Sequence, residues 1–338
     1  MEKSPLHPQT VEHLRAMVSD AIQHREEHRA LVIYDTQSPL ASILLHAYRE
    51  VLPDARYLDI DQTTPEEILQ AIHELQSRDL VVLIQSSNFR LNEFRFRIVL
   101  FERSLKTIEH LHLNRMSEDQ YQTYIDALAY DPAYYRTYGP ALKRALDGAS
   151  RVEVFCPGTV LTYDSPMEEA KLNIGDYTGM KNIGGTFPIG EVFTEPKEWA
   201  GVNGEVMIFA FAGFDHQVQF HKPFKAVIKE GILDAPEAPT VFQETLAMIR
   251  EEERVMVREL GLGLNRALTK QRVVNDITAF ERMKGVHLSL GEKHGVYKKP
   301  GLQPKKTRYH VDVFIDVERI LVDGRALFEA GDYLPHAW

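Results

Sequence analysis

Histidine and aspartate alternate along one strand-like segment near the C-terminus of this chain of 338 residues. In YHVDVFIDV, His310, Asp312 and Phe314 fall on one face, because successive side chains of a strand point to opposite faces. An imidazole and a carboxylate two residues apart on one face can bind the same metal ion. A second strand-like segment, VHLSLG, carries His287 before a glycine turn. These segments predict a metal site on neighbouring strands, although an H-x-D pattern alone is more often a solvated or hydrogen-bonded pair.

Two glutamates extend this set of candidate ligands. Glu191 lies in FPIGEVFTEP and Glu259 in RELGLGLN, both where an apolar segment meets a glycine-marked turn. Three carboxylates and two imidazoles suit two divalent ions, because carboxylates bridge and neutralise charge while histidines supply nitrogen donors. Two ions about 3.5–4 Å apart can deprotonate a water and polarise a carbonyl. The predicted metal ligands are Glu191, Glu259, His287, His310 and Asp312.

Ordinary structural roles compete with this interpretation. Glu191 could cap a turn instead of binding an ion. The segment 240–260 reads as a helix that begins at Thr240 and ends near Gly261, which would place Glu259 at an exposed helix C-terminus. An anion is mildly unfavourable at that position because of the helix dipole, so a bound cation explains it better. Glu281, which precedes the His287 segment, could orient a ligand or stand exposed.

Charge and composition exclude several classes of function. The chain has 39 basic and 49 acidic residues, a net charge of −10, which disfavours general nucleic-acid binding. No apolar run reaches the roughly 20 residues that span a bilayer, and the N-terminus lacks the apolar stretch of a signal peptide. Cys156 is the single cysteine, so no disulfide can form within the chain. We expect a cytoplasmic protein with no nucleic-acid or membrane partner.

The predicted pattern of secondary structure changes between the two halves of the sequence. Strand-like ALVIYD, ARYLDID and DLVVLIQS alternate with helical segments, and Ser38 and Thr64 stand as N-caps before prolines. This alternation is typical of a parallel sheet covered on both faces, so residues 1–148 are predicted to form an open α/β domain. Glycine-punctuated strands follow. Residues 149–338 are therefore predicted to form a β-rich catalytic domain that carries the metal ligands.

The order of these motifs resembles the thermophilic aminopeptidase family, the aminopeptidase T and aminopeptidase S group of dinuclear metallopeptidases. The resemblance runs through NIGGTFPIGEVFTEP, GVNGEV, ELGLGLN, ERMKGVHLSLG and the H-x-D strand, over residues 180–315. It implies that the five predicted ligands occupy the family's metal positions, with two ions such as Zn²⁺, Co²⁺ or Mn²⁺. It also implies that Glu259 handles the catalytic water. By this resemblance the chain is a hydrolase, a homodimeric metallo-aminopeptidase that removes N-terminal residues from short peptides through a metal-bound water.

One position departs from the family pattern. The family carries a catalytic tyrosine seven residues after the position of His287, and here that residue is His294, with Tyr297 three residues further on. A histidine can donate a hydrogen bond or act as a general acid, so His294 is predicted to be catalytic, with Tyr297 as the alternative.

The same fold family also includes a mononuclear ferrous enzyme, 2,5-dihydroxypyridine 5,6-dioxygenase, which opens a hydroxylated pyridine ring. His287, His310 and Asp312 match the two-histidine, one-carboxylate set of such Fe(II) oxygenases. Three hypotheses therefore remain open. They are a dinuclear aminopeptidase, a ring-cleaving non-haem iron dioxygenase, and a catalytically altered metal-binding relative.

Overall fold

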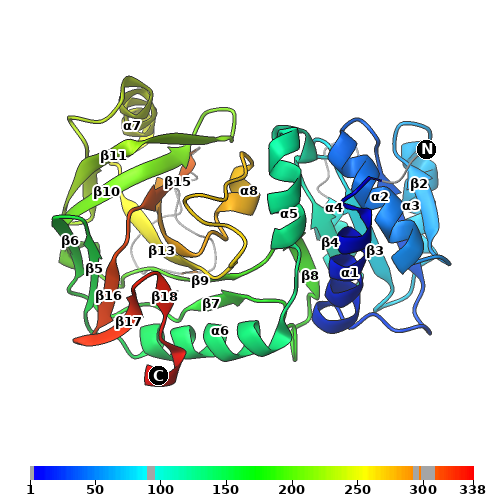
Figure 1. Cartoon of the computed structure of the whole chain (residues 1–338), viewed down its shortest axis with the longest axis horizontal. Coiled ribbons are helices and arrows are strands. Elements are labelled where there is room, and N and C mark those ends of the chain that lie inside the picture. The colour runs from blue at the N-terminus through cyan, green and yellow to red at the C-terminus, as the bar shows by residue number, and fades with distance from the viewer. Residues whose placement is uncertain (1–3, 90–95, 292–296, 298–308) are drawn as a thin grey trace. The chain divides into compact units, whose positions relative to one another are not determined.

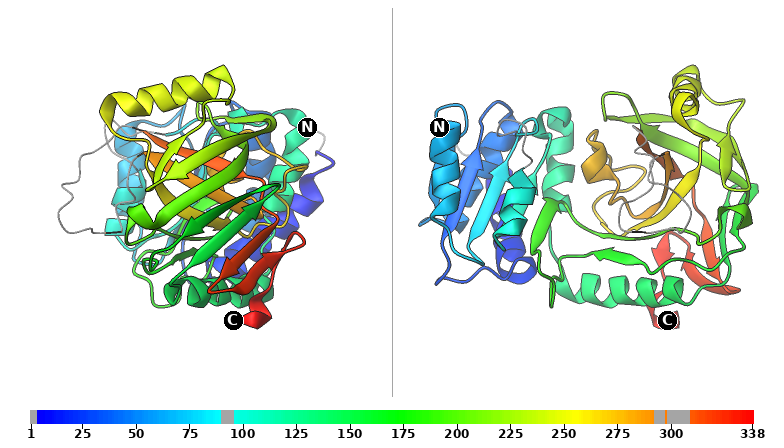
Figure 2. Two further views of the ribbon diagram at one scale, coloured as in Figure 1. Left: turned by 90° about the vertical axis from the view of Figure 1, so that its left-hand side faces the viewer. Right: turned by 180° about the vertical axis from the view of Figure 1, so that it is seen from behind.

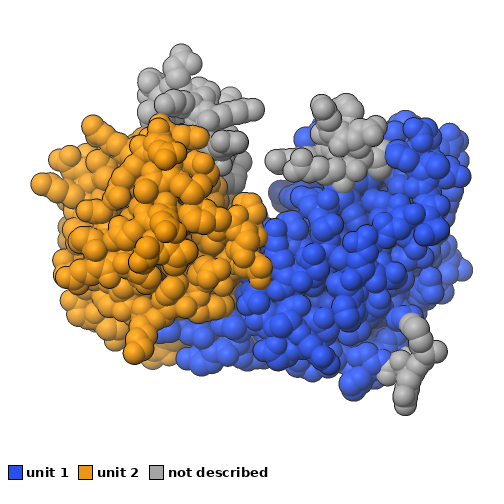
Figure 3. Space-filling model, turned by 90° about the horizontal axis from the view of Figure 1, so that it is seen from above, with its two compact units in different colours: residues 1–132, 175–189, 270–279 blue, residues 133–174, 190–269, 280–338 orange. Residues whose placement is uncertain are grey.

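The structure is a computed structural model that describes residues 4–89, 96–291, 297 and 309–338. The chain forms two compact units, each built from segments that are discontinuous in sequence, and Figure 3 colours them separately. Unit 1 comprises Met1–Pro132, Gly175–Ile189 and Lys270–Ala279, and unit 2 comprises Ala133–Ile174, Gly190–Thr269 and Phe280–Trp338. The domain boundary predicted after residue 148 stays a prediction.

Unit 1 contains a five-stranded parallel sheet, which confirms the open α/β arrangement predicted for the first half of the chain (Figure 1). The strand order is β2-β1-β3-β4-β8, and every neighbouring pair is parallel. The strands are β1 (Ala30–Tyr34), β2 (Arg56–Asp59), β3 (Leu80–Ile84), β4 (Lys106–His110) and β8 (Gly184–Phe187).

Two helices of unit 1, α2 (Pro39–Val51) and α3 (Pro65–His73), begin where the sequence predicts. Ser38 caps α2 by accepting a hydrogen bond from the Ala41 amide at 3.1 Å. Thr64 and Glu67 form a reciprocal capping box at the start of α3. Helices α3 and α4 contribute apolar side chains to a core that also contains residues of β1 and β3. The helices are α1 (His7–Ala16), continued by a π-helical turn (Met17–Ala21), α2 (Pro39–Val51), α3 (Pro65–His73), α4 (Phe96–Glu102) and α5 (Tyr121–Ala127).

Unit 2 is dominated by an antiparallel sheet of 13 strands that curls on itself, as Figures 1 and 2 show. The main strand order is β18-β17-β16-β5-β6-β10-β15-β14-β13-β9-β7, and β11 and β12 extend from β10. The strands are β5 (Val152–Cys156), β6 (Thr159–Tyr163), β7 (Lys171–Asn173), β9 (Glu191–Thr194), β10 (Val202–Ala212), β11 (Val218–Lys229), β12 (Ile232–Asp234), β13 (Val257–Gly263), β14 (Gly285–Gly291), β15 (His310–Ile315), β16 (Arg319–Val322), β17 (Arg325–Glu329) and β18 (Asp332–Tyr333).

Few helices accompany this sheet. Phe242 of α7 packs its ring against Phe211 of β10 and Phe224 of β11, with centroids 4.7 and 5.1 Å apart. The helices are α6 (Pro132–Asp147) and α7 (Thr240–Glu252), and the short α8 (Ile277–Phe280) lies at the boundary where the chain passes from unit 1 into unit 2. Single 3₁₀ turns occur at Leu113–Arg115, Glu118–Gln120, Trp199–Gly201 and Pro335–Ala337. Within the ranges that the structure describes, no helix is long and apolar enough to span a bilayer.

The helix predicted over 240–260 is wrong in its second half. Helix α7 ends at Glu252, Glu253 is already extended, and Val257–Gly263 forms β13. Two β-branched valines at 255 and 257 favour a strand, and the glycines at 261 and 263 disfavour a helix. β13 is buried along its whole length, and it pairs with β9 on one side and β14 on the other. Glu259 therefore lies on a central strand rather than at a helix C-terminus.

Candidate metal centre

Three adjacent strands of unit 2 bring distant parts of the sequence to one face of the sheet. Glu191 on β9 pairs with Gly263 on β13, and Gly261 on β13 pairs with His287 on β14. Directly paired residues share a face, and residues two apart on one strand do the same. Glu259, two residues before Gly261, therefore faces the same side as Glu191 and His287.

The next strand adds the predicted histidine and aspartate to this face. On β15, Asp312 pairs with Ser289 of β14, and His310 pairs with Gly291. Ser289 follows His287 by two residues, so Asp312 and His310 continue the row that begins at His287. The predicted placement of His310 and Asp312 on a strand beside the His287 strand is confirmed.

Glu191, Glu259 and His287 form a tight buried group. His287 Nε2 lies 3.3 Å from Glu191 Oε1 and 3.4 Å from Glu259 Oε1. One possible ligand atom from each residue lies within 4.8 Å of the other two. Two carboxylate oxygens and an imidazole nitrogen converging in this way are a donor set that a divalent ion such as zinc accepts. The residues present thus fit the metal that the sequence predicts.

Two glycines of the ELGLG segment make room for this arrangement. A Cβ atom on Gly261 would lie 2.1 Å from Nε2 of the His287 imidazole. A Cβ atom on Gly263 would lie 1.8 Å from the carbonyl oxygen of Met283. Contacts this short are impossible, so glycine at 261 admits the ring and glycine at 263 admits the main chain that precedes β14. Glu259, Gly261 and Gly263 lie on the same face of β13, so this face carries one candidate ligand followed by two positions without a side chain.

The charges of the group stabilise one another. Burial opposes a charged imidazole, but hydrogen bonds to Glu191 and Glu259 outweigh it and raise the pKa of His287 well above its ordinary value. Burial alone would raise the pKa of Glu191, yet the charge of Arg282 and the hydrogen bond to His287 lower it. The group is therefore a buried site organised around a cation, either a proton on His287 or a metal ion.

His310 and Asp312 form a separate pair beside this group. His310 Nε2 lies 3.2 Å from Asp312 Oδ1, and the Ser289 hydroxyl donates to the same oxygen at 2.6 Å. The His310 side chain is 39% exposed and that of Asp312 only 6%. The imidazole is therefore open to solvent, whereas the carboxylate is buried. Burial opposes protonation of His310, but the charge of Asp312 outweighs it and raises the pKa of His310 to about 10.

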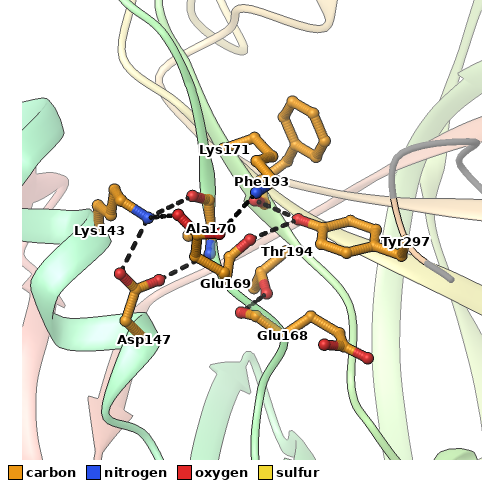
Figure 4. Close-up of polar contacts among 9 residues, drawn as sticks. All are labelled: Lys143, Asp147, Glu168, Glu169, Ala170, Lys171, Phe193, Thr194 and Tyr297. Carbon is orange, nitrogen blue, oxygen red and sulfur yellow. Dashed lines mark hydrogen bonds and ion pairs between the residues drawn. The ribbon is translucent and has the colours of Figure 1, made fainter. Parts of the chain in front are cut away.

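The sequence predicts two alternative proton donors, His294 and Tyr297. His294 lies outside the described residues. The hydroxyl of Tyr297 lies 3.0 Å from the carbonyl oxygen of Glu169 and 3.2 Å from that of Phe193 (Figure 4). Burial, followed by the negative charge of Glu259, raises the pKa of Tyr297. Its proton is thus held by the main chain near β7 and β9, and a proton-donating role would require that hydrogen bond to break.

Two residues of this site escaped the reasoning from sequence. Ser289 holds Asp312, and strand alternation from His287 was a signal that could have identified it. Arg282 forms a buried ion pair with Glu191. Its position beside Glu281 was visible, but nothing in the sequence indicates which carboxylate an arginine meets.

A cavity of about 300 Å³ opens beside His310. Its walls come from the turn between β10 and β11, from α7 and from the start of β15. The lining includes Phe214, Met248, Ile249 and Val311 together with the imidazoles of His216 and His310, and among the described residues it contains no carboxylate, lysine or arginine. The described walls of the space next to the His310–Asp312 pair are therefore mainly apolar, with the His310 imidazole at its edge.

Comparison with known proteins shows the fold. No family model matches the chain, and no curated protein matches it in sequence. Among solved structures, the chain is similar to AmpT from Thermus thermophilus, a thermophilic aminopeptidase, with a TM-score of 0.62 and 12% sequence identity. The match covers 97% of this chain and 100% of that chain. The resemblance predicted from the sequence is thus confirmed at the level of the fold.

Proposed function

We propose that this protein is a metal-dependent aminopeptidase that hydrolyses the N-terminal peptide bond of short peptides. The observation that carries the proposal is the buried convergence of Glu191, Glu259 and His287 in a chain with the fold of AmpT. A hydrolase of this kind needs a fixed set of charged ligands away from bulk water, and these three side chains are all at least nine-tenths buried.

The roles of the residues follow from their positions. A bound divalent ion supplies a Lewis acid that polarises a carbonyl and makes a nearby water more acidic. Glu191 Oε1, Glu259 Oε1 and His287 Nε2 would hold that ion, which requires His287 to release its proton. Glu259 would accept a proton from the attacking water and return it to the leaving amine. Metal binding and proton transfer would thus meet at one buried carboxylate.

The His310–Asp312 pair would provide ligands for a second ion. Asp312 is held through one oxygen, because the Ser289 hydroxyl and the His310 imidazole both contact its Oδ1 atom. A rigid carboxylate beside the first group suits a dinuclear centre. His294 keeps its predicted role as a donor to the developing oxyanion or to the leaving amine. The homodimer and the cytoplasmic location stay part of the proposal.

The iron dioxygenase hypothesis has weaker support. It needs His287, His310 and Asp312 to surround one ion. His287 Nε2 instead faces Glu191 and Glu259 at 3.3 and 3.4 Å, and His310 faces Asp312. A nitrogen placed between two carboxylates supports a carboxylate-rich hydrolytic centre over a two-histidine ferrous site.

The cavity beside His310 suggests the substrate side chain. Its volume of about 300 Å³ and the apolar side chains of Phe214, Met248, Ile249 and Val311 favour an apolar first residue. We expect leucyl peptides to be hydrolysed faster than glycyl peptides, because a leucyl side chain gains apolar contacts in this cavity.

The test is hydrolysis of short peptides after loading with Zn²⁺, Co²⁺ or Mn²⁺. Mass spectrometry should detect a free N-terminal leucine from an unblocked leucyl peptide and none from its N-acetylated form. Glu259→Gln, which keeps the size of the side chain, should lower the rate by at least about 100-fold. No release with any of the three ions would contradict the proposal. Oxygen consumption by an iron-loaded sample with 2,5-dihydroxypyridine would support the dioxygenase instead.

A further inference from the structure

A buried arginine contacts the ligand group from one side. Arg282 lies between α8 and β14, and its side chain is only 8% exposed. Its Nη1 atom forms an ion pair with Glu191 Oε2, and its Nη2 atom lies 2.8 Å from Glu281 Oε1. One planar guanidinium therefore joins a predicted ligand to a carboxylate outside the ligand set.

This contact divides the two oxygens of Glu191 between different partners. Oε1 faces the imidazole of His287, and Oε2 faces Arg282. A carboxylate that bridges two ions, or binds one ion through both oxygens, needs both of them for metal. With Arg282 in place, the Glu191 side chain presents a single oxygen toward His287 and Glu259.

We propose that Arg282 is a positioning residue that fixes Glu191 as a ligand through Oε1 alone, with Glu281 holding the guanidinium in place. The inference rests on the proposed metal site. Arg282 supplies the positive charge that a second ion would otherwise supply to Oε2. A second ion would therefore take its ligands from residues other than Glu191.

The main chain also holds Arg282 in this position. Its carbonyl oxygen accepts a hydrogen bond from the Asn265 amide at 2.9 Å. A Cβ atom on Gly263 would lie 2.8 Å from the Arg282 carbonyl carbon, so glycine is required for this approach. Gly263 is also the residue that pairs with Glu191 on β9. The end of β13 therefore sets both the arginine and the carboxylate that it binds.

The contact between Arg282 and Glu191 predicts the effect of replacing the arginine. Without the guanidinium, Oε2 of Glu191 loses its partner and turns toward the nearest cation, which is the bound metal ion. The coordination number of that ion then rises. Co²⁺ reports such a change directly, because its visible absorption weakens as four-coordinate geometry gives way to five or six ligands. A purely structural role for Arg282 would lower stability and leave this spectrum unchanged.

The experiment compares Arg282→Met, Arg282→Lys and Glu281→Gln with the unaltered full chain, each loaded with Co²⁺. Affinity is measured by competition with a chromophoric chelator, and geometry by the visible spectrum. Arg282→Met should lower the affinity for Co²⁺ by about 10-fold or more and weaken the visible absorption. Arg282→Lys keeps the charge but loses the planar fork, so the same changes should be smaller. Glu281→Gln should give the smallest change in the same direction.

Arg258→Met is the matched control. Arg258 is a second buried arginine, and its Nη2 atom lies 2.8 Å from Glu253, which is outside the ligand group. Its variant should lose stability but keep the unaltered Co²⁺ spectrum. If Arg282→Met does not fold, Arg282→Lys decides. Wild-type spectra and affinity in the Arg282 variants would overturn the inference and leave the metal site standing, whereas no Co²⁺ binding by the unaltered chain would overturn the metal site itself.

Discussion

The two units each bury a histidine completely, and the two imidazoles have opposite electrostatic properties. In unit 1, His110 Nε2 lies 2.8 Å from the Tyr48 hydroxyl and its Nδ1 lies 3.0 Å from the Tyr124 hydroxyl. Burial lowers the pKa of His110 to about 3. In unit 2, His287 is equally buried, but two carboxylates face it and its pKa is raised.

The difference teaches that burial does not decide what a histidine does. Low-dielectric surroundings disfavour a charged imidazole, and neutral phenols do nothing to reverse that cost. Carboxylates at hydrogen-bond distance reverse it, because they are themselves stabilised by a nearby cation. His110 is a neutral structural residue at the end of β4, whereas the surroundings of His287 favour a positive charge.

The largest expected effect separates these two roles. His287→Phe removes the nitrogen that Glu191 and Glu259 face, so affinity for Zn²⁺ should fall by more than about 100-fold. His110→Phe should leave Zn²⁺ affinity unchanged, because the variant alters neutral contacts in unit 1. Competition with a chromophoric chelator measures both. Equal losses in the two variants would show that the comparison is wrong.

A glycine tests whether the position of the imidazole matters as much as its presence. Gly261→Ala would place a Cβ atom 2.1 Å from His287 Nε2, so the ring must move away from the carboxylates. Zn²⁺ affinity should fall by about 10–100-fold, and stability by about 1–3 kcal/mol. Gly148→Ala is the control, since its nearest atom would lie at 3.8 Å. Unchanged affinity in Gly261→Ala would mean that His287 does not bind metal from this position.

The pH dependence of stability tests the neutral histidine. The folded pKa of His110 is about 3, below the unfolded value of about 6.5, so the unfolded chain binds more protons between these values. The stabilisation is present above pH 6.5 and is lost as pH falls toward 3. From pH 7 to pH 5 the loss from His110 should be about 2 kcal/mol. The half-buried His24, with its pKa lowered to about 4, adds a smaller loss.

Urea unfolding at pH 7 and pH 5 measures this loss. His110→Phe should be less stable at pH 7, because the hydroxyls of Tyr48 and Tyr124 each lose a hydrogen bond to the imidazole, yet it should lose less stability on acidification. His73→Asn, at an exposed position of α3, is the control and should keep the wild-type pH dependence. An unaltered pH dependence in His110→Phe would contradict a neutral His110.

The smallest expected effect concerns the hydroxyl that holds Asp312. Ser289→Ala removes one hydrogen bond at 2.6 Å while His310 still contacts the same carboxylate oxygen. The free energy of unfolding should fall by about 1 kcal/mol. Ser19→Ala removes a hydrogen bond to Asp20 at 2.8 Å on the exposed surface, and it should stay within about 0.5 kcal/mol of the unaltered chain. Equal small losses would indicate that burial of the Ser289 bond adds nothing.

Much of the fold could be predicted from local sequence patterns. The rest depends on pairing between segments that are distant in the sequence. Strand alternation identified the shared face of His310 and Asp312, and the caps at Ser38 and Thr64 were readable from a few neighbouring residues. The end of α7 was not readable, because a charged helical pattern continues past Glu252 until pairing with β9 and β14 overrides it. Propensity yields to such tertiary contacts.

The sequence allowed the residues of the site to be predicted, but not their positions relative to one another. Periodicity shows which side chains share a strand face, but the register that sets His287 opposite Gly261 depends on segments far apart in sequence. The contact of Arg282 with Glu191 depends on that same register, so no local signal could assign it. Tyr297 was named as a possible donor, yet its hydroxyl meets carbonyl groups that sequence alone cannot place.

The central claim is that Glu191, Glu259 and His287 bind a metal ion together. Crystals of the full chain grown with Co²⁺ or Zn²⁺ and measured on both sides of the metal absorption edge test it directly. The account predicts an anomalous peak bounded by His287 Nε2, Glu191 Oε1 and Glu259 Oε1, where the two carboxylate oxygens lie 3.3 and 3.4 Å from the imidazole nitrogen. A metal-dependent peptidase activity in the same sample, with no peak at these atoms or with the peak elsewhere, would contradict it.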